Sequence, residues 1–153
     1  MKFDQYAAKG NQIVNEIAIE LGFPENKELA GRLLRATLHT LRDRLTIPMS
    51  FQLMAQLPMV LKALYVEGWK YQEKPHRIKH IGEFIREVIH EDQPAGHHDI
   101  ATAKDGENAV RAVLKVLRSH ISEGEVVHIL KSIPPDLRKL WGNDDLVRNL
   151  VKN

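Results

Sequence analysis

Two pairs of side chains have the spacing of a metal site. Glu87 and His90, and Glu125 and His128, each stand three residues apart, so each pair would share one face of a helix. Two such pairs, joined by two further glutamates, hold the metal ions of di-iron helical bundles. His128, however, falls outside the apolar stripe of its own segment, which predicts that it faces solvent. We therefore interpret both pairs as surface residues.

Further histidines lie near the middle of the chain. His76 and His80 are four residues apart, and His97-His98-Asp99 follows in a segment that also contains proline and glycine. Imidazoles four residues apart on a helix can bind zinc or nickel. Because the chain has eight histidines, accidental spacings are expected, and we interpret these histidines as solvated groups without a metal or cofactor.

Motifs of known catalytic chemistry are absent from the sequence. It holds no nucleophile elbow, phosphate-binding loop, dinucleotide-binding glycine motif or His-Glu-x-x-His. It also has no cysteine, which excludes disulfides, thiol catalysis and thiolate metal sites. The sequence therefore favours a protein that is not an enzyme, and a metal-dependent enzyme using the His and Glu clusters is kept as the third hypothesis.

The composition is that of an ordinary globular protein. Of 153 residues, 43% are hydrophobic and 27% are charged, with a formal net charge of +2. This balance excludes a histone-like or polybasic protein. No apolar run is long enough to span a membrane, and the first residues form no signal core. We therefore expect a cytoplasmic protein without a membrane partner.

The chain repeats itself. A shift of 76 residues places Leu33–Tyr65 on Ala109–Trp141 without a gap, and eight of the 33 pairs are identical. A looser match at a shift of 71 residues places Ile13–Ile17 on Phe84–Val88. We predict a single domain over residues 1–153, with one repeat at about 4–69, a linker at about 70–78 and a second repeat at about 79–151.

Each repeat predicts the same series of helices. Apolar residues recur at helical spacing, and the second helix is predicted to begin after Asn26 or Thr102 and the third after Thr46 or Ser122. No segment alternates with the period of a strand. The predicted fold is all-α: a helical bundle of two repeats of three to four helices, related by a pseudo-twofold axis and sharing one core.

Several motifs resemble a known family. They are Leu41-Arg42-Asp43-Arg44-Leu45-Thr46, Ala55-Gln56-Leu57-Pro58 and Tyr65-Val66-Glu67-Gly68-Trp69, with a second set in Ala109–Leu114, Ser122–Glu125 and Leu137–Trp141. These resemble the bacterial family named domain of unknown function 2267, although Ile47-Pro48-Met49 replaces the acidic start expected for a third helix. The resemblance implies a duplicated helical fold and no assigned activity, so no catalytic residue is carried over.

Four arginines are identical in the two repeats and form the core of two basic stripes. Arg35 and Arg42 lie on the predicted second helix, and Arg111 and Arg118 lie at the matching positions of the other repeat. One interpretation is internal ion pairing with the glutamates Glu16, Glu20, Glu87 or Glu91. The other is a pair of ridges that bind a polyanion or an acidic partner. The near-neutral net charge favours internal pairing.

Two aromatic residues, Trp69 and Tyr71, stand at the start of the linker. Such residues dominate binding hot spots, and they also fill seams between packed halves, which we favour here. With the four arginines they complete the candidate binding surface. The leading hypothesis is a non-catalytic interaction or scaffold module for a protein partner. The alternative is polyanion or nucleic-acid binding, which we rank below it, and the sequence leaves the oligomeric state open.

Overall fold

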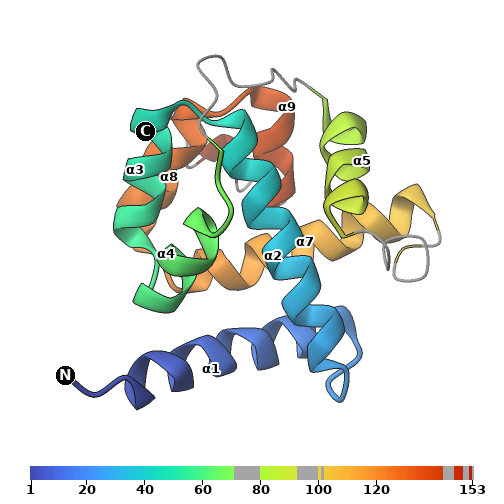
Figure 1. Cartoon of the computed structure of the whole chain (residues 1–153). Helices are drawn as coiled ribbons and strands as arrows, with labels where there is room; N and C mark the ends of the chain where they lie inside the picture. The colour runs from blue at the N-terminus through green and yellow to red at the C-terminus, as the bar shows by residue number, and fades with distance from the viewer. Residues whose placement is uncertain (71–79, 93–99, 101, 143–146, 150–151, 153) are drawn as a thin grey trace.

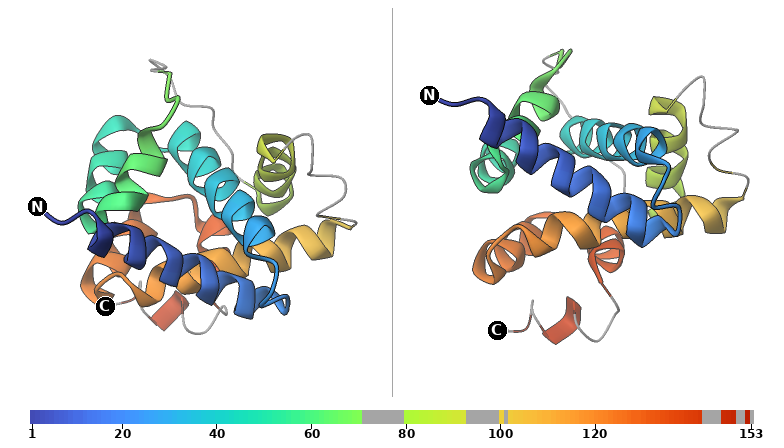
Figure 2. Two further views of the ribbon diagram at one scale, coloured as in Figure 1. Left: turned by 60° about the horizontal axis from the view of Figure 1, so that its bottom comes forward. Right: turned by 90° about the horizontal axis from the view of Figure 1, so that it is seen from below.

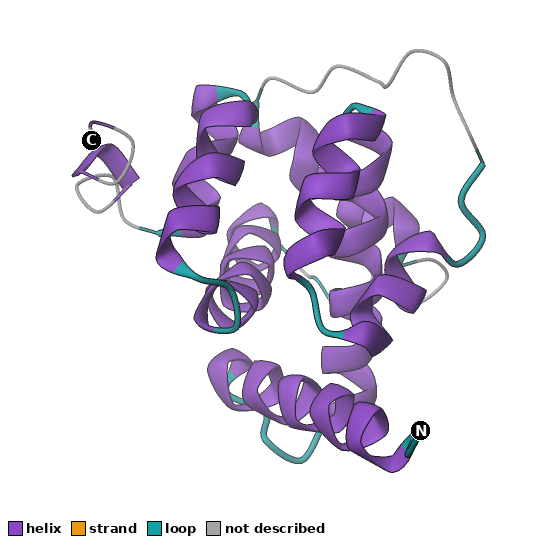
Figure 3. Ribbon diagram, turned by 90° about the vertical axis from the view of Figure 1, so that its left-hand side faces the viewer, coloured by secondary structure: helices purple, strands orange, loops and turns teal. Residues whose placement is uncertain are grey.

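The computed structural model describes residues 1–70, 80–92, 100, 102–142, 147–149 and 152. Over these residues the chain forms helices and no strand, which confirms the predicted all-α fold (Figure 3). None of the described helices is long and apolar enough to cross a bilayer. Tyr71, His76 and the segment His97-His98-Asp99 lie outside the described residues.

The helices follow the predicted order. The first half of the chain contains α1 (Asp4–Leu21), α2 (Lys27–Arg44), α3 (Ile47–Gln56) and α4 (Met59–Val66). The second half contains α5 (Ile81–Glu91), α7 (Ala103–Ser119), α8 (Glu123–Ser132), the short α9 (Pro135–Arg138) and the 3₁₀ helix η1 (Lys139–Trp141).

Local chemistry sets where these helices begin and end. The side chains of Asn26, Thr46, Thr102 and Ser122 each accept a hydrogen bond from the backbone N–H three residues further on, which confirms the four predicted N-caps. Helix α1 ends at Gly22, whose φ of 86° is left-handed and therefore suits glycine. These caps use only short-range sequence, which is why they were predictable.

The helix boundaries recur along the chain. Shifted by 76 residues, α3 coincides with α8, α2 coincides with α7 to within one residue, and α4 covers α9 and η1. The first helices match less well, since α5 is shorter than α1. This recurrence supports the pseudo-twofold relation, which stays a prediction that superposition of the two halves tests.

The helices of both halves enclose one hydrophobic core. Leu38, Leu41, Leu114 and Leu117 are all buried and belong to a single cluster, which confirms that they share a core. Helix α1 packs along α2 and α7, α5 packs against the same two helices, and α3 lies beside α8 (Figures 1 and 2). Each half therefore covers helices of the other.

Ion pairs cross between the halves at matching positions. Glu16 on α1 lies 2.6 Å from His120 at the end of α7, and Glu87 on α5 lies 3.2 Å from Arg44 at the end of α2. The two acidic residues differ by 71 positions and the two basic ones by 76. Three of the four expected glutamates thus contact basic side chains other than the four repeated arginines: Glu16 contacts His120, Glu20 contacts Lys115 and Glu87 contacts Arg44.

Candidate binding site

The repeated arginines bind the main chain that ends the fourth helix of each half. In the first half, Arg42 Nη1 donates hydrogen bonds to the carbonyl oxygens of Tyr65 (2.8 Å) and Glu67 (2.7 Å). In the second half, Arg118 Nη1 donates to the carbonyl oxygen of Trp141 (3.2 Å). Both the donors and the aromatic acceptors differ by 76 positions, so the same contact is made twice.

Arg111 extends this arrangement in the second half. Its Nη1 donates to the carbonyl oxygens of Lys139 and Gly142, and its other nitrogens bind Glu107 on the same helix. The last carbonyls of a helix lack intrahelical donors and carry partial negative charge. A guanidinium, with several N–H donors and a fixed positive charge, satisfies them well.

The expected ion-pair partners of these arginines were wrong. Three of the four do lie within ion-pair distance of a carboxylate, but the carboxylates are close in sequence or at the same helix end. The pairs are Arg35 with Glu67 (3.6 Å), Arg42 with Asp43 (3.8 Å) and Arg111 with Glu107 (2.9 Å). Within the described residues, no carboxylate lies within ion-pair distance of Arg118. The stripes face the fourth helix, whereas the expected glutamates lie on the first helices, where Glu16, Glu20 and Glu87 contact other basic side chains.

His39 joins the same site in the first half. Its Nε2–H donates to the carbonyl oxygen of Leu64 at 2.8 Å, which fixes the tautomer of the ring. Burial lowers the pKa of His39 below its usual value, against the effect of this hydrogen bond, and the positive charges of Arg42 and Arg35 lower the pKa further. His39 is therefore a neutral capping group for α4.

Aromatic side chains close the first half of the site. Tyr65 is fully buried, and its hydroxyl shares a hydrogen bond of 2.7 Å with Ser50 on α3. Burial raises the pKa of this hydroxyl well above its usual value. The ring of Trp69 packs edge-on against Tyr65 at 5.6 Å between centroids. Trp69 thus covers the end of α4 in its own half.

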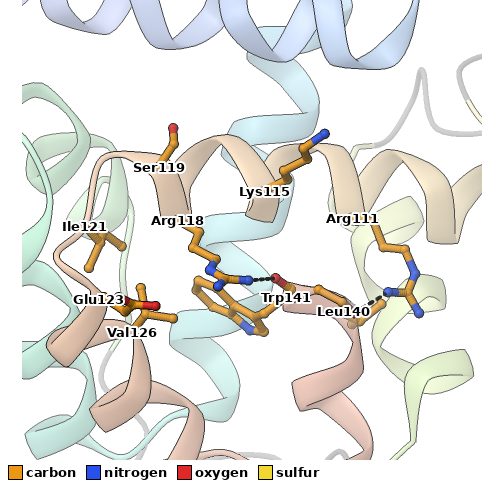
Figure 4. A pocket seen from close by; sticks show the side chains of 10 residues that line it. Arg111, Lys115, Arg118, Ser119, Ile121, Glu123, Val126, Leu140 and Trp141 are labelled. Atoms are coloured by element: carbon orange, nitrogen blue, oxygen red, sulfur yellow. Dashed lines mark hydrogen bonds between the residues drawn. The ribbon is translucent and has the colours of Figure 1, made fainter. Parts of the chain in front are cut away.

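The second half has an open pocket at the equivalent place (Figure 4). We call it the α7 pocket; its volume is about 640 Å³, and it lies between α7, the start of α8 and η1. Its described lining residues are Arg111, Lys115, Arg118, Ser119, Ile121, Glu123, Val126, Leu140, Trp141 and Gly142. Figure 4 shows Arg118 directed toward Trp141, while Lys115 points to the opposite side of α7, where its Nζ lies 2.9 Å from Glu20.

A family model described as "Uncharacterized conserved protein (DUF2267)" matches residues 10–140 of the chain. The match spans both halves of the fold and all the arginines described above. The chain belongs to the DUF2267 family. No curated protein matches it.

In this DUF2267 protein, the histidines and glutamates considered above as metal ligands are exposed or contact other side chains. Glu87 pairs with Arg44, and His90 and His128 are exposed, as predicted for His128. His80 Nδ1 lies 3.7 Å from Asp136 Oδ2, and the side chain of His80 is 71% exposed. Among the residues with a described placement, no three His, Asp or Glu side chains gather closely enough to hold a metal ion.

Sequence reasoning about this DUF2267 chain missed what the arginines bind. A backbone carbonyl is the same atom in every residue, so no residue type marks it as an acceptor. The signal that could have found it is the joint repetition of Arg42 with Tyr65 and of Arg118 with Trp141, each 23 residues apart. The α7 pocket left no such signal, because its lining comes from three separate segments.

Proposed function

We propose that this protein is a non-catalytic interaction module that holds an acidic segment of a partner protein in the α7 pocket. The observation that carries this proposal is that Arg118 has hydrogen-bond donors left over. Its Nη1 donates one hydrogen bond, to Trp141, and its remaining nitrogens have no acceptor in the described part of the chain. A guanidinium with free donors beside an apolar pocket is suited to bind a carboxylate.

The pocket offers two kinds of contact to such a segment. Val126, Leu140 and Trp141 supply the apolar lining. Figure 4 shows Arg118 between Glu123 on one side and Arg111 on the other. Because Glu123 repels a carboxylate, an acidic group would be directed away from Glu123 and toward Arg118. The volume of about 640 Å³ accommodates one or two side chains. We therefore expect the bound segment to carry an Asp or Glu next to a Leu, Phe or Trp.

A protein partner fits this arrangement better than a nucleic acid. A nucleic acid needs a continuous basic track along its phosphates. Here Arg42 is buried and bound to carbonyls, and Arg111 is bound to carbonyls and Glu107. Arg35 lies 3.6 Å from Glu67, and Lys115 is paired with Glu20. Of the four arginines, Arg118 therefore leaves one available charge, which suits a single carboxylate.

An array of random ten-residue peptides tests the proposal. We expect the wild-type protein to bind peptides enriched in Asp or Glu adjacent to Leu, Phe or Trp. Arg118→Gln should weaken the Kd of the best peptides by tenfold or more, and Arg118→Lys should recover part of the loss because it keeps the charge. Circular dichroism shows whether each variant keeps its helices.

Lys131→Gln provides the matched control, since Lys131 is an exposed residue at the end of α8 that does not line the pocket. It removes the same charge and should leave the Kd unchanged. Equal losses in the two variants would show non-specific electrostatic attraction and contradict the proposal. Tighter binding of a 20-base-pair DNA duplex than of any peptide, or no peptide enrichment at all, would also contradict it.

A further inference from the structure

A second cavity lies between α5 and the start of α7. Its volume is about 730 Å³, and four isoleucines supply its apolar wall: Ile81, Ile85, Ile89 and Ile100. We call it the isoleucine cavity. Three of these residues are spaced by four along α5, so they share one helical face. Ile81 and Ile89 are only partly buried, which leaves part of this face open to the cavity.

Helices α5 and α7 approach closely beside the cavity. A Cβ atom on Gly106 of α7 would lie 2.6 Å from a methyl carbon of Ile85 and 3.2 Å from one of Ile100. Glycine therefore lets the two helices approach at this point. On the open side of this contact, the described lining residues at the start of α7 are short or polar: Thr102, Ala103, Lys104 and Glu107.

The rim of the cavity is positively charged. Arg86 of α5 and Lys104 of α7 both line it, and within the described residues neither has a carboxylate at ion-pair distance. The one acidic lining residue, Glu107, is bound by Arg111 at 2.9 Å. Two available cations therefore stand beside an apolar wall.

Lys104 lies in the first turn of α7, where the N–H groups without intrahelical acceptors carry partial positive charge and an anion is preferred. Asp105 of the same turn already supplies one negative charge. A carboxylate bound beside Lys104 would lie close to the lysine and to these N–H groups, so this end of the cavity suits the negatively charged end of a ligand.

We propose that the isoleucine cavity binds a small amphipathic carboxylate, namely a medium-chain fatty acid. Its carboxylate contacts Arg86 and Lys104 at the start of α7, and its alkyl chain lies along the four isoleucines. The volume is within the range of small-ligand sites. The proposal is independent of the α7 pocket, because the two cavities share no described lining residue.

Decanoate, kept below its critical micelle concentration, is the probe. Isothermal titration of the full chain should show one site per molecule. Acetate, which lacks the tail, and decanol, which lacks the charge, should each bind at least tenfold more weakly. Arg86→Gln and Lys104→Glu should each weaken decanoate binding by tenfold or more. Lys131→Glu, an exposed control with the same charge change as Lys104→Glu, should leave the Kd unchanged.

Lys104→Glu has a second readout that separates a binding effect from misfolding. It places a favourable charge in the first turn of α7, so the free variant should unfold at the same or a higher temperature than the wild type. Equal binding of decanoate to wild type and both cavity variants would overturn the proposal. Binding only to phosphatidylglycerol vesicles, with no response to free decanoate, would overturn it in favour of a membrane surface. The peptide array reports separately on the α7 pocket.

Discussion

Arg42 and Arg118 hold equivalent positions in the two halves, yet they differ in burial and in the number of hydrogen bonds that they donate. Arg42 is 8% exposed, donates to two carbonyl oxygens and lies near Asp43. Arg118 is half-buried and donates to one carbonyl oxygen. The same side chain is thus a buried structural group in one half and a partly available one in the other.

The neighbouring residues explain this difference. In the first half, Ser50 binds the hydroxyl of Tyr65, and Trp69 packs against the same ring. In the second half, the equivalent of Ser50 is Val126 and that of Tyr65 is Trp141, and both line the α7 pocket. The comparison teaches that a capping contact made in both halves can enclose the arginine in one half and leave it beside an open pocket in the other.

The largest expected effects test whether the two halves share their core equally. Leu38→Ala and Leu114→Ala remove equivalent, fully buried side chains. We expect each to lower the free energy of unfolding by about 2–5 kcal/mol, because each leaves a cavity in a packed core. Urea unfolding, followed by circular dichroism and by tryptophan fluorescence, should give one transition for each variant. Separate transitions of the two halves would contradict a shared core.

The next test concerns the arginines themselves. Arg42→Met should cost about 3 kcal/mol of unfolding free energy, since it leaves buried carbonyl oxygens without donors. Arg118→Met should cost about 1 kcal/mol, since one hydrogen bond at a half-buried site is lost. Chemical denaturation at pH 7 measures both. Equal costs would show that Arg118 contributes as much to stability as Arg42. They would remove the main support for binding in the α7 pocket.

A smaller effect is the pH dependence of stability that His39 of the first half causes. Because the pKa of His39 is lowered in the folded protein, the unfolded chain binds more protons near neutral pH. The contribution of His39 is complete above its ordinary pKa of 6.5 and is lost as the pH falls below that value. We therefore expect the free energy of unfolding to fall between pH 7 and pH 5.5.

His39→Gln should remove this loss, since an amide can still donate to Leu64 and does not titrate. His128→Gln is the matched control, because His128 is exposed. Denaturation curves at the two pH values give the comparison. An unchanged pH dependence in His39→Gln would show that another group titrates.

The smallest effect concerns the ion pairs between the halves. Double-mutant cycles should give coupling energies of about 0.5–1 kcal/mol for Arg44 with Glu87, and a similar value for His120 with Glu16. In each pair the basic side chain is mostly buried and the acidic one is about 40% exposed, so the surroundings are alike. A coupling near zero in only one pair would show that the halves differ here as well.

Much of the fold was predictable because its causes are local. Asn26 and Thr102 act as caps through a hydrogen bond three residues away, and the leucines of α2 and α7 recur at helical spacing. The candidate site was predictable only in part. The repeated arginines were recognised from the internal repeat, but their acceptors were assigned to the wrong helices, because sequence does not show which helix lies opposite a stripe.

The sequence by itself determined the helices, their caps and the shared core, since each follows from short-range spacing and the burial of apolar side chains. The tertiary structure decided what the polar residues do. The packing of α4 against α2 places the carbonyl oxygen of Tyr65 beside Arg42, and η1 against α7 does the same for Trp141 and Arg118. Whether the guanidinium is then enclosed or open depends on neighbours far apart in sequence, and only folding brings these together.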